Sequence, residues 1–192
     1  MANKKTTALT KEDYEKIITT IKNGFIHNGI EHRPNNRIAT ILVLESNLGL
    51  RIGDILLLRL SDIIKDGQRY RLSIIEQKTG KERTYTVPLQ IYIYLQEYAI
   101  QNGIHKNARL FPISARAVQK LLREAAAYLE LDNIGTHSFR KFYATDIYVE
   151  NNYNIVLVQH LLQHSSSAIT QRYIGIQQKE IEDAIEKHIN LL

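Results

Sequence analysis

Side chains that could carry out phosphoryl transfer occupy three separate places in this chain of 192 residues. His137 and Arg140 lie close together, His164 and Tyr173 follow them, and Arg51 stands far upstream. Two arginines can clamp the non-bridging oxygens of a phosphodiester, and such preorganised positive charge is usually the largest catalytic contribution. A tyrosine hydroxyl can attack phosphorus to give a phosphotyrosine, and a histidine or lysine can protonate the leaving oxygen. The sequence therefore predicts phosphodiester chemistry with a tyrosine nucleophile.

Arg51 stands between two apolar stretches that must hold it in place. Residues 35–48 predict a helix that is hydrophobic on most sides and therefore central. Gly49 ends that helix, and residues 54–60 predict a short one. A charge with so much apolar sequence on both sides must be paired or functional. Asp54 could form a structural pair with Arg51, or it could orient the arginine for binding.

Two alternating segments, residues 70–75 and 83–87, predict a β-hairpin. The turn between them carries Lys78 and Lys81 on either side of Gly80. A hairpin tip can reach into a groove or a cleft. A charged turn that keeps the protein soluble explains the same lysines, so the hairpin alone does not decide between the two.

The rest of the chain is predicted to be mainly helical. Thr10 and Asp13 form a capping-box pair at a helix start, and residues 29–34 predict a polar loop. Further helices are expected at residues 89–102, 115–131, 137–149, 155–162, 168–173 and 177–192. The predicted fold class is thus mainly α with a small antiparallel β-sheet (α+β). One domain of residues 9–192 would follow a disordered lead of residues 1–8.

Two helices carry polar faces that suit an anion. His137 and Arg140 share one face of a first helical turn, where backbone N–H groups and the helix dipole favour negative charge. The helix of residues 115–131 has one apolar face and one basic face. The basic face, which could lie along a DNA backbone or simply be solvated, comprises Arg116, Lys120 and Arg123.

Composition narrows the class of protein. The net charge of +5 is a modest argument for a polyanionic partner. The absence of cysteine excludes disulfides, cysteine zinc sites and thiol catalysis. Apolar runs are too short to span a bilayer and residues 1–7 lack a signal core, so a cytoplasmic location is expected. His160 and His164 have the spacing of two metal ligands, but without further ligands no metal or other cofactor is expected.

The chain resembles the tyrosine recombinase (phage integrase) family, in its catalytic domain. The motifs that carry the resemblance are, in order, Leu-Gly-Leu-Arg-Ile-Gly-Asp ending at Asp54, Gln-Lys-Thr-Gly ending at Gly80, His-Ser-Phe-Arg ending at Arg140, Leu-Leu-Gln-His-Ser-Ser ending at Ser166, and Tyr173. Gln163 departs from the family's usual glycine, and Gly53 from a small hydroxyl residue. Residues 1–8 leave no room for the N-terminal DNA-clamping domain of most members.

The resemblance implies six catalytic residues. They are Arg51, Lys78, His137, Arg140, His164 and Tyr173. The two arginines would bind the scissile phosphate, the tyrosine would attack it, and the lysine, with Lys81 as its fallback, would protonate the 5′ leaving oxygen. His137 would act in acid–base steps, His164 would hydrogen-bond the phosphate, and Asp54 would support Arg51.

The implied activity is site-specific recombination that cleaves and rejoins DNA through a covalent 3′-phosphotyrosine. The implied partners are double-stranded DNA with attachment or recombination sites, and further copies of the chain. A free monomer would assemble as a tetramer on DNA through its last helix, residues 177–192. Two alternatives remain: a non-catalytic DNA-binding regulator with the same fold, and a type IB topoisomerase-like strand transferase.

Overall fold

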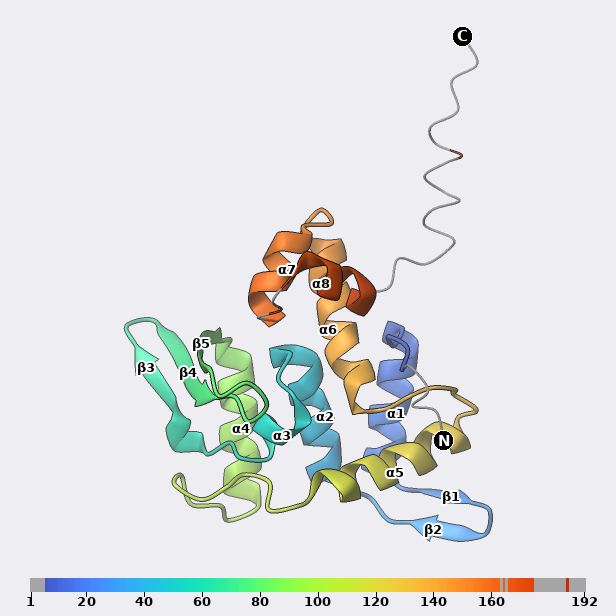
Figure 1. The fold of residues 1–192 in the computed structure, drawn as a ribbon. Coiled ribbons are helices and arrows are strands. Elements are labelled where there is room, and N and C mark those ends of the chain that lie inside the picture. Colours follow the sequence, from blue (N-terminus) through green and yellow to red (C-terminus); the bar gives the residue numbers. More distant parts are fainter. Residues whose placement is uncertain (1–5, 163, 165, 175–185, 187–192) are drawn as a thin grey trace. The chain divides into compact units, whose positions relative to one another are not determined.

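The computed structural model describes residues 6–162, 164, 166–174 and 186. The chain divides into two compact units, Met1–Tyr143 and Ala144–Leu192, where the sequence predicts one domain (Figure 1). Helices predominate and the strands form two small antiparallel sheets, which confirms the expected fold class. The helix expected at residues 177–192 lies outside the described residues.

The first unit contains most of the elements. They are α1 (Lys11–Asn23), β1 (Phe25–His27), β2 (Ile30–His32), α2 (Asn36–Leu48), α3 (Ile52–Ile55), the 3₁₀ helix η1 (Leu60–Asp62), β3 (Ile63–Asp66), β4 (Arg69–Ile75), β5 (Glu82–Val87), α4 (Leu89–Gln101), α5 (Ala115–Tyr128) and the start of α6 (Thr136–Glu150). The second unit contains the rest of α6, α7 (Ile155–Leu162) and α8 (Ser167–Ile174).

Helix α2 runs through the core of the first unit, as its hydrophobic sequence predicts. The Asn35 side chain caps it by accepting the Ile38 N–H at 3.0 Å. Several of its apolar side chains, among them Ile41 and Leu44, are fully buried. The helix ends at Gly49, which is left-handed with φ 58° and donates its N–H to the Glu45 carbonyl. The sharp turn at Gly49 sends the chain directly into Arg51 and α3.

The larger sheet has the strand order β3-β4-β5. The expected hairpin is confirmed as β4 and β5, with Tyr70 opposite Val87 and Ile75 opposite Glu82. This register leaves residues 76–81 as the connecting turn. Strand β3 was not predicted, because a segment of four residues is too short to show an alternating pattern.

Three other segments differ from the sequence prediction. Strands β1 and β2 form a hairpin where residues 29–34 were expected to be a loop, because Gly24 (φ 77°) ends α1 before Phe25. The helix expected at residues 54–60 stops at Ile55, since Arg59 is extended and bridges to Arg109. Helix α5 ends at Tyr128, three residues earlier than expected.

The chain preceding α1 has defined contacts. The Lys141 ammonium donates to the Thr6 carbonyl, and the Thr7 N–H donates to the Asn133 carbonyl at 3.2 Å. Thr6 and Thr7 thus contact the first unit, while the disorder predicted for residues 1–8 stays a prediction.

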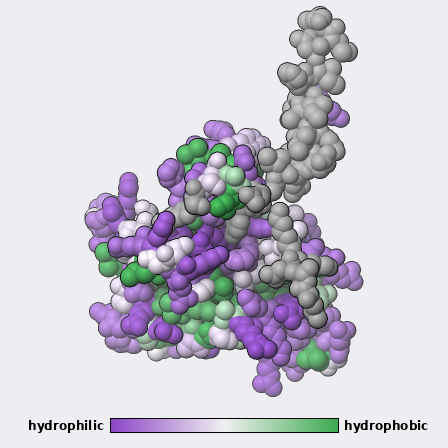
Figure 2. Space-filling view, viewed as in Figure 1, coloured by the Kyte–Doolittle hydropathy of each residue, from purple (hydrophilic) through white to green (hydrophobic). Residues whose placement is uncertain are grey.

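The surface in view is mostly hydrophilic, with hydrophobic residues interspersed (Figure 2). Among the described residues, no helix is long and apolar enough to cross a membrane.

Substitution of Gly49 by alanine should destabilise the first unit. A Cβ there would lie 2.4 Å from the Tyr143 ring, and the left-handed backbone disfavours any side chain. We expect the free energy of unfolding in urea to fall by about 2–5 kcal/mol, from backbone strain plus overpacking. Gly103→Ala is the matched control, because Gly103 has φ 61° with nothing within 4 Å of an added Cβ. Equal losses for the two variants would contradict the steric contact with Tyr143.

Candidate active site

Arg140 is held at the beginning of α6 by the core of the first unit. Its side chain is only 2% exposed and donates to the Gly49 carbonyl. The surrounding turns of α6 are anchored because Phe139 is fully buried and Phe142 stacks on Tyr14 at a ring distance of 5.1 Å. Arg140 is therefore tied to the chain two residues before Arg51, which brings the two predicted phosphate clamps to one place.

Arg51 lies at the start of α3 and forms an ion pair with Glu76. Its Nη1 is 2.6 Å from Glu76 Oε2, and its side chain is 19% exposed. The expected partner, Asp54, instead accepts the Gln77 backbone N–H at 2.9 Å. The direct Arg51–Asp54 pair is thus absent from the described contacts. Through this bond Asp54 holds the turn that follows Glu76, and its support of Arg51 stays a prediction.

Glu76 was not singled out by the sequence, although it is the most connected acidic residue near the candidate site. Its side chain is 1% exposed, and it also accepts from Thr79 Oγ1 at 2.9 Å and from the buried Arg83 at 3.2 Å. Burial raises its pKa, but the bonds from Arg51 and Thr79 and the charges of both arginines outweigh burial and hold the pKa below its ordinary value. Glu76 is therefore a carboxylate at neutral pH.

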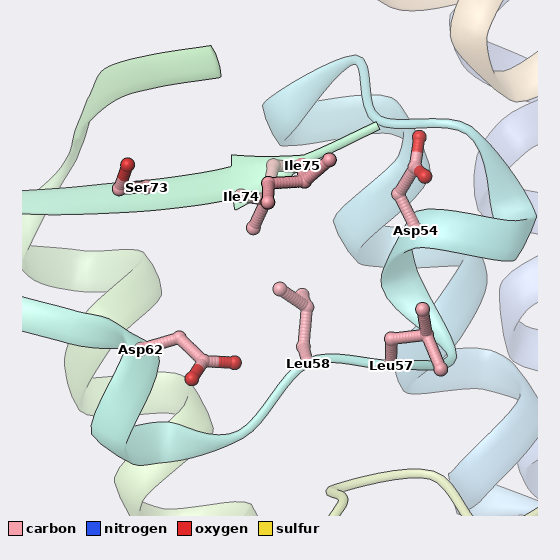
Figure 3. Close-up of a pocket in the computed structure, with 7 residues that line it drawn as sticks. All are labelled: Asp54, Leu57, Leu58, Asp62, Ser73, Ile74 and Ile75. Atoms are coloured by element: carbon pink, nitrogen blue, oxygen red, sulfur yellow. The ribbon is translucent and has the colours of Figure 1, made fainter. Parts of the chain in front are cut away.

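A cavity of about 260 Å³ lies beside this corner, between β4 and the segment from α3 to η1 (Figure 3). Its wall is largely apolar, with Leu57, Leu58 and Ile74. Asp54 stands at the end of the cavity nearest the end of β4 (Figure 3). Among the predicted site residues that the structure describes, only Asp54 lines this cavity.

His137 lies among positive charges. Partial burial lowers the pKa of its imidazole, and the charges of Arg140, Lys78 and Arg51 lower it further. The charges that act on His137 therefore include both predicted arginines and the predicted lysine. Lys78 and Lys81 are both exposed in the turn, but it is Lys78 whose charge acts on His137.

The second unit carries the other two predicted residues. His164 follows α7, and its Nδ1 lies 3.1 Å from the hydroxyl of Thr170, which is fully buried in α8. The backbone N–H of His164 also donates to the Gln159 carbonyl at 3.1 Å. Tyr173 belongs to α8, one helical turn after Thr170. The predicted histidine and nucleophile are thus carried by directly bonded segments of one unit.

The basic face predicted on α5 is exposed. Arg116, Lys120 and Arg123 are all accessible, while Val118 and Leu122 on the opposite side are buried. This arrangement is available for contact with a polyanion. In the described ranges, no three His, Asp or Glu side chains gather closely enough to hold a metal ion.

Glu45 is a second buried acid that the sequence did not single out. It is 0% exposed, and neither carboxyl oxygen has a hydrogen-bond partner. Burial raises the pKa of Glu45 well above its ordinary value, although the Arg140 charge opposes the shift. Its position in the apolar run of α2 was the available signal, since a charged residue there has to be buried.

The first unit thus carries Arg51, Lys78, His137 and Arg140, four of the side chains that the sequence predicts for phosphoryl transfer. The chain belongs to the phage integrase family, whose model matches residues 7–180, a family of tyrosine recombinases that cleave and rejoin DNA.

Individual relatives agree with this assignment. The probable integrase/recombinase YoeC of Bacillus subtilis is 35% identical over 147 residues, which are 74% of this chain and 79% of that protein. Tyrosine recombinase XerA of Pyrococcus furiosus is 26% identical over 193 residues, which are 96% of this chain and 62% of XerA.

Solved structures share the fold. The post-cleavage complex of XerH recombinase with a difH substrate has a TM-score of 0.74 at 21% identity, over 97% of this chain and 54% of XerH. The catalytic domain of bacteriophage HP1 integrase has a TM-score of 0.65 at 19% identity, over 96% of both chains. The chain thus spans somewhat more than half of these two Xer proteins and 96% of the HP1 integrase catalytic domain.

Removal of the Lys78 charge should raise the pKa of His137 toward its ordinary value. Lys78→Met leaves one positive charge fewer beside the imidazole, and an NMR titration of the ring protons measures the change. Because the folded pKa is lowered, the unfolded chain binds the proton more readily. His137 therefore lowers the free energy of unfolding at pH values below its ordinary pKa. This loss disappears as the pH rises from the folded pKa to the ordinary pKa. Lys65→Met, on β3, is the control. An unchanged His137 pKa in Lys78→Met would contradict the proximity of Lys78 to the imidazole.

Glu45 should make the protein less stable as pH rises. The folded carboxyl keeps its proton above the ordinary pKa of 4.5, whereas the unfolded one loses it. The free energy of unfolding should therefore fall by up to about 1.4 kcal/mol per pH unit from there up to the folded pKa. Glu45→Gln should abolish this part of the slope in urea unfolding measured at several pH values, and Glu97→Gln, on the exposed side of α4, should retain it. An unchanged slope in Glu45→Gln would contradict the raised pKa.

Proposed function

We propose that this chain is the catalytic part of a site-specific DNA recombinase that acts through a 3′-phosphotyrosine. The observation that carries the proposal is the convergence of Arg51, Lys78, His137 and Arg140 in the first unit of a phage integrase family member. A phosphodiester is the ligand that two arginines, a lysine and a histidine would bind together.

The chemistry assigns each group a step. Arg51 and Arg140 hold the non-bridging oxygens of the scissile phosphate and stabilise the charge that grows in the transition state. The Tyr173 oxygen forms a bond to phosphorus as the bond to the 5′ oxygen breaks, and Lys78 gives that oxygen a proton. The lowered pKa of His137 supports a neutral imidazole that can accept a proton. Attack by a 5′ hydroxyl reverses the sequence and rejoins the strand.

Double-stranded DNA is the proposed partner. Among the structural neighbours, XerH is bound to its difH substrate and a λ integrase dimer to a core site. On this chain, the exposed basic face of α5 would contact the backbone of such a site, which would make binding depend on salt. Exchange between two sites requires several copies of the chain, for which we propose a tetramer on DNA.

The test is a covalent adduct with DNA. The protein is incubated with a nicked suicide duplex carrying its native attachment sequence, and adducts are counted on a denaturing gel. The wild type should become linked to DNA, while Tyr173→Phe should lose the adduct entirely because the nucleophilic oxygen is gone. Tyr153→Phe, an exposed tyrosine of the same unit, should keep it. Binding without an adduct on the cognate site would favour the non-catalytic regulator instead.

A further inference from the structure

Glu76 connects a predicted phosphate clamp with the turn that carries the predicted general acid. Its Oε2 accepts from Arg51 at 2.6 Å and also from the Thr79 hydroxyl at 2.9 Å. Its other oxygen faces the buried Arg83 at 3.2 Å. One carboxylate therefore contacts a residue that lies 25 positions upstream and a residue next to Lys78.

The turn itself is closed around Lys78. The Glu76 N–H donates to the Lys81 carbonyl at 2.9 Å, and the Gly80 N–H donates to the Glu76 carbonyl at 2.8 Å. On the other side of the lysine, Asp54 accepts the Gln77 N–H at 2.9 Å. The residues before and after Lys78 are both tied to the corner formed by Arg51 and Asp54.

The charges of Arg51 and Arg83 explain why Glu76 stays ionised and bonded to both arginines. A buried carboxylate is stable only when it is paired and hydrogen-bonded, and Arg83 together with Arg51 supplies that pairing. Since a guanidinium carries five N–H donors, the bond to Glu76 orients Arg51 and leaves it capacity to bind a phosphate. Removing the carboxylate would leave two arginines without it and would release Thr79.

We propose that Glu76 is a positioning residue that couples Arg51 to Lys78, so that phosphate binding and protonation of the leaving oxygen are aligned by one carboxylate. This inference rests on the proposed recombinase function. The Glu76 side chain is only 1% exposed. It acts through Arg51 on one side and through Thr79 and the turn on the other.

A substrate with sulfur in place of the bridging 5′ oxygen separates this role from a merely structural one. In the ordinary reaction the Tyr173–phosphorus bond forms, the bond from phosphorus to the 5′ oxygen breaks, and Lys78 protonates that oxygen. A thiolate leaves without a proton because a thiol is far more acidic than an alcohol. The sulfur substrate thus bypasses Lys78 while it still needs Arg51. Single-turnover adduct formation is measured on both DNAs.

Thr79→Val removes the link to the turn and keeps the ion pairs of Glu76. We expect about tenfold slower cleavage of ordinary DNA and a nearly wild-type rate on the sulfur substrate. Glu76→Gln also weakens the hold on Arg51, so cleavage of ordinary DNA should slow by about 100-fold and sulfur should restore only part of it. Thr84→Val is the matched control, because it loses a comparable hydroxyl contact, to Ser73 at 3.1 Å, away from the turn.

Two results would overturn the proposal. One is equal slowing on both substrates in Thr79→Val and Glu76→Gln, which means a general structural loss. The other is a wild-type rate for both variants on ordinary DNA. If the wild-type protein itself forms no adduct with either substrate, it is the recombinase function that fails, and the separate role of Glu76 fails with it.

Discussion

Mutual repulsion of cations is the constraint on which the rest of the first unit depends. Two unit charges 4 Å apart repel by about 4 kcal/mol at an effective dielectric constant of 20. Arg51, Lys78 and Arg140 all lie near enough to His137 to lower its pKa. A fold that gathers such groups has to oppose their repulsion without cancelling the positive charge that an anion would meet.

The two arginines are held by different kinds of acceptor. Arg140 donates to the Gly49 carbonyl, a neutral group that fixes the guanidinium and leaves its charge intact. The buried carboxyl of Glu45 lies close enough for its pKa to feel Arg140, but burial favours the neutral acid and so preserves that charge as well. Arg51 has the ionised Glu76, yet Arg83 shares that carboxylate. Glu76 with its two arginines therefore keeps a net positive charge.

Local sequence signals predicted the elements that carry the site, because those signals are short-range. The apolar run in residues 35–48, the break at Gly49 and the alternation in residues 70–75 each act within a few positions, and the structure confirms the helix, its end and the strand. Helical spacing alone does not show that α1 ends before Phe25, because the contact at that end of the helix is tertiary. A side chain at Gly24 would meet the His32 carbonyl at 2.7 Å.

The partners of the site residues could not be read from spacing in the same way. Asp54 was the nearby acid and so the expected partner of Arg51, but Glu76, in the turn after β4, takes that place. Only the register of β4 and β5 brings Glu76 and Arg83 together. From the sequence alone, a charged hairpin tip is equally consistent with a solvated turn. The sequence does show one signal of buried charge. Glu45 stands in an apolar helix and Arg83 in a strand, and both side chains are buried.

The second unit also holds a predicted site residue, His164, through a buried polar side chain, Thr170. The Thr170 hydroxyl donates to the Ser166 carbonyl at 3.5 Å, which disposes its oxygen to accept from His164 Nδ1. Thr170 is fully buried, so this bond is shielded from water and fixes the histidine ring relative to α8. Since α8 also carries Tyr173, any displacement of that helix moves the predicted phosphate ligand and the predicted nucleophile as one body. In each unit, a buried polar side chain therefore connects segments that carry predicted site residues: Glu76 does so in the first unit and Thr170 in the second.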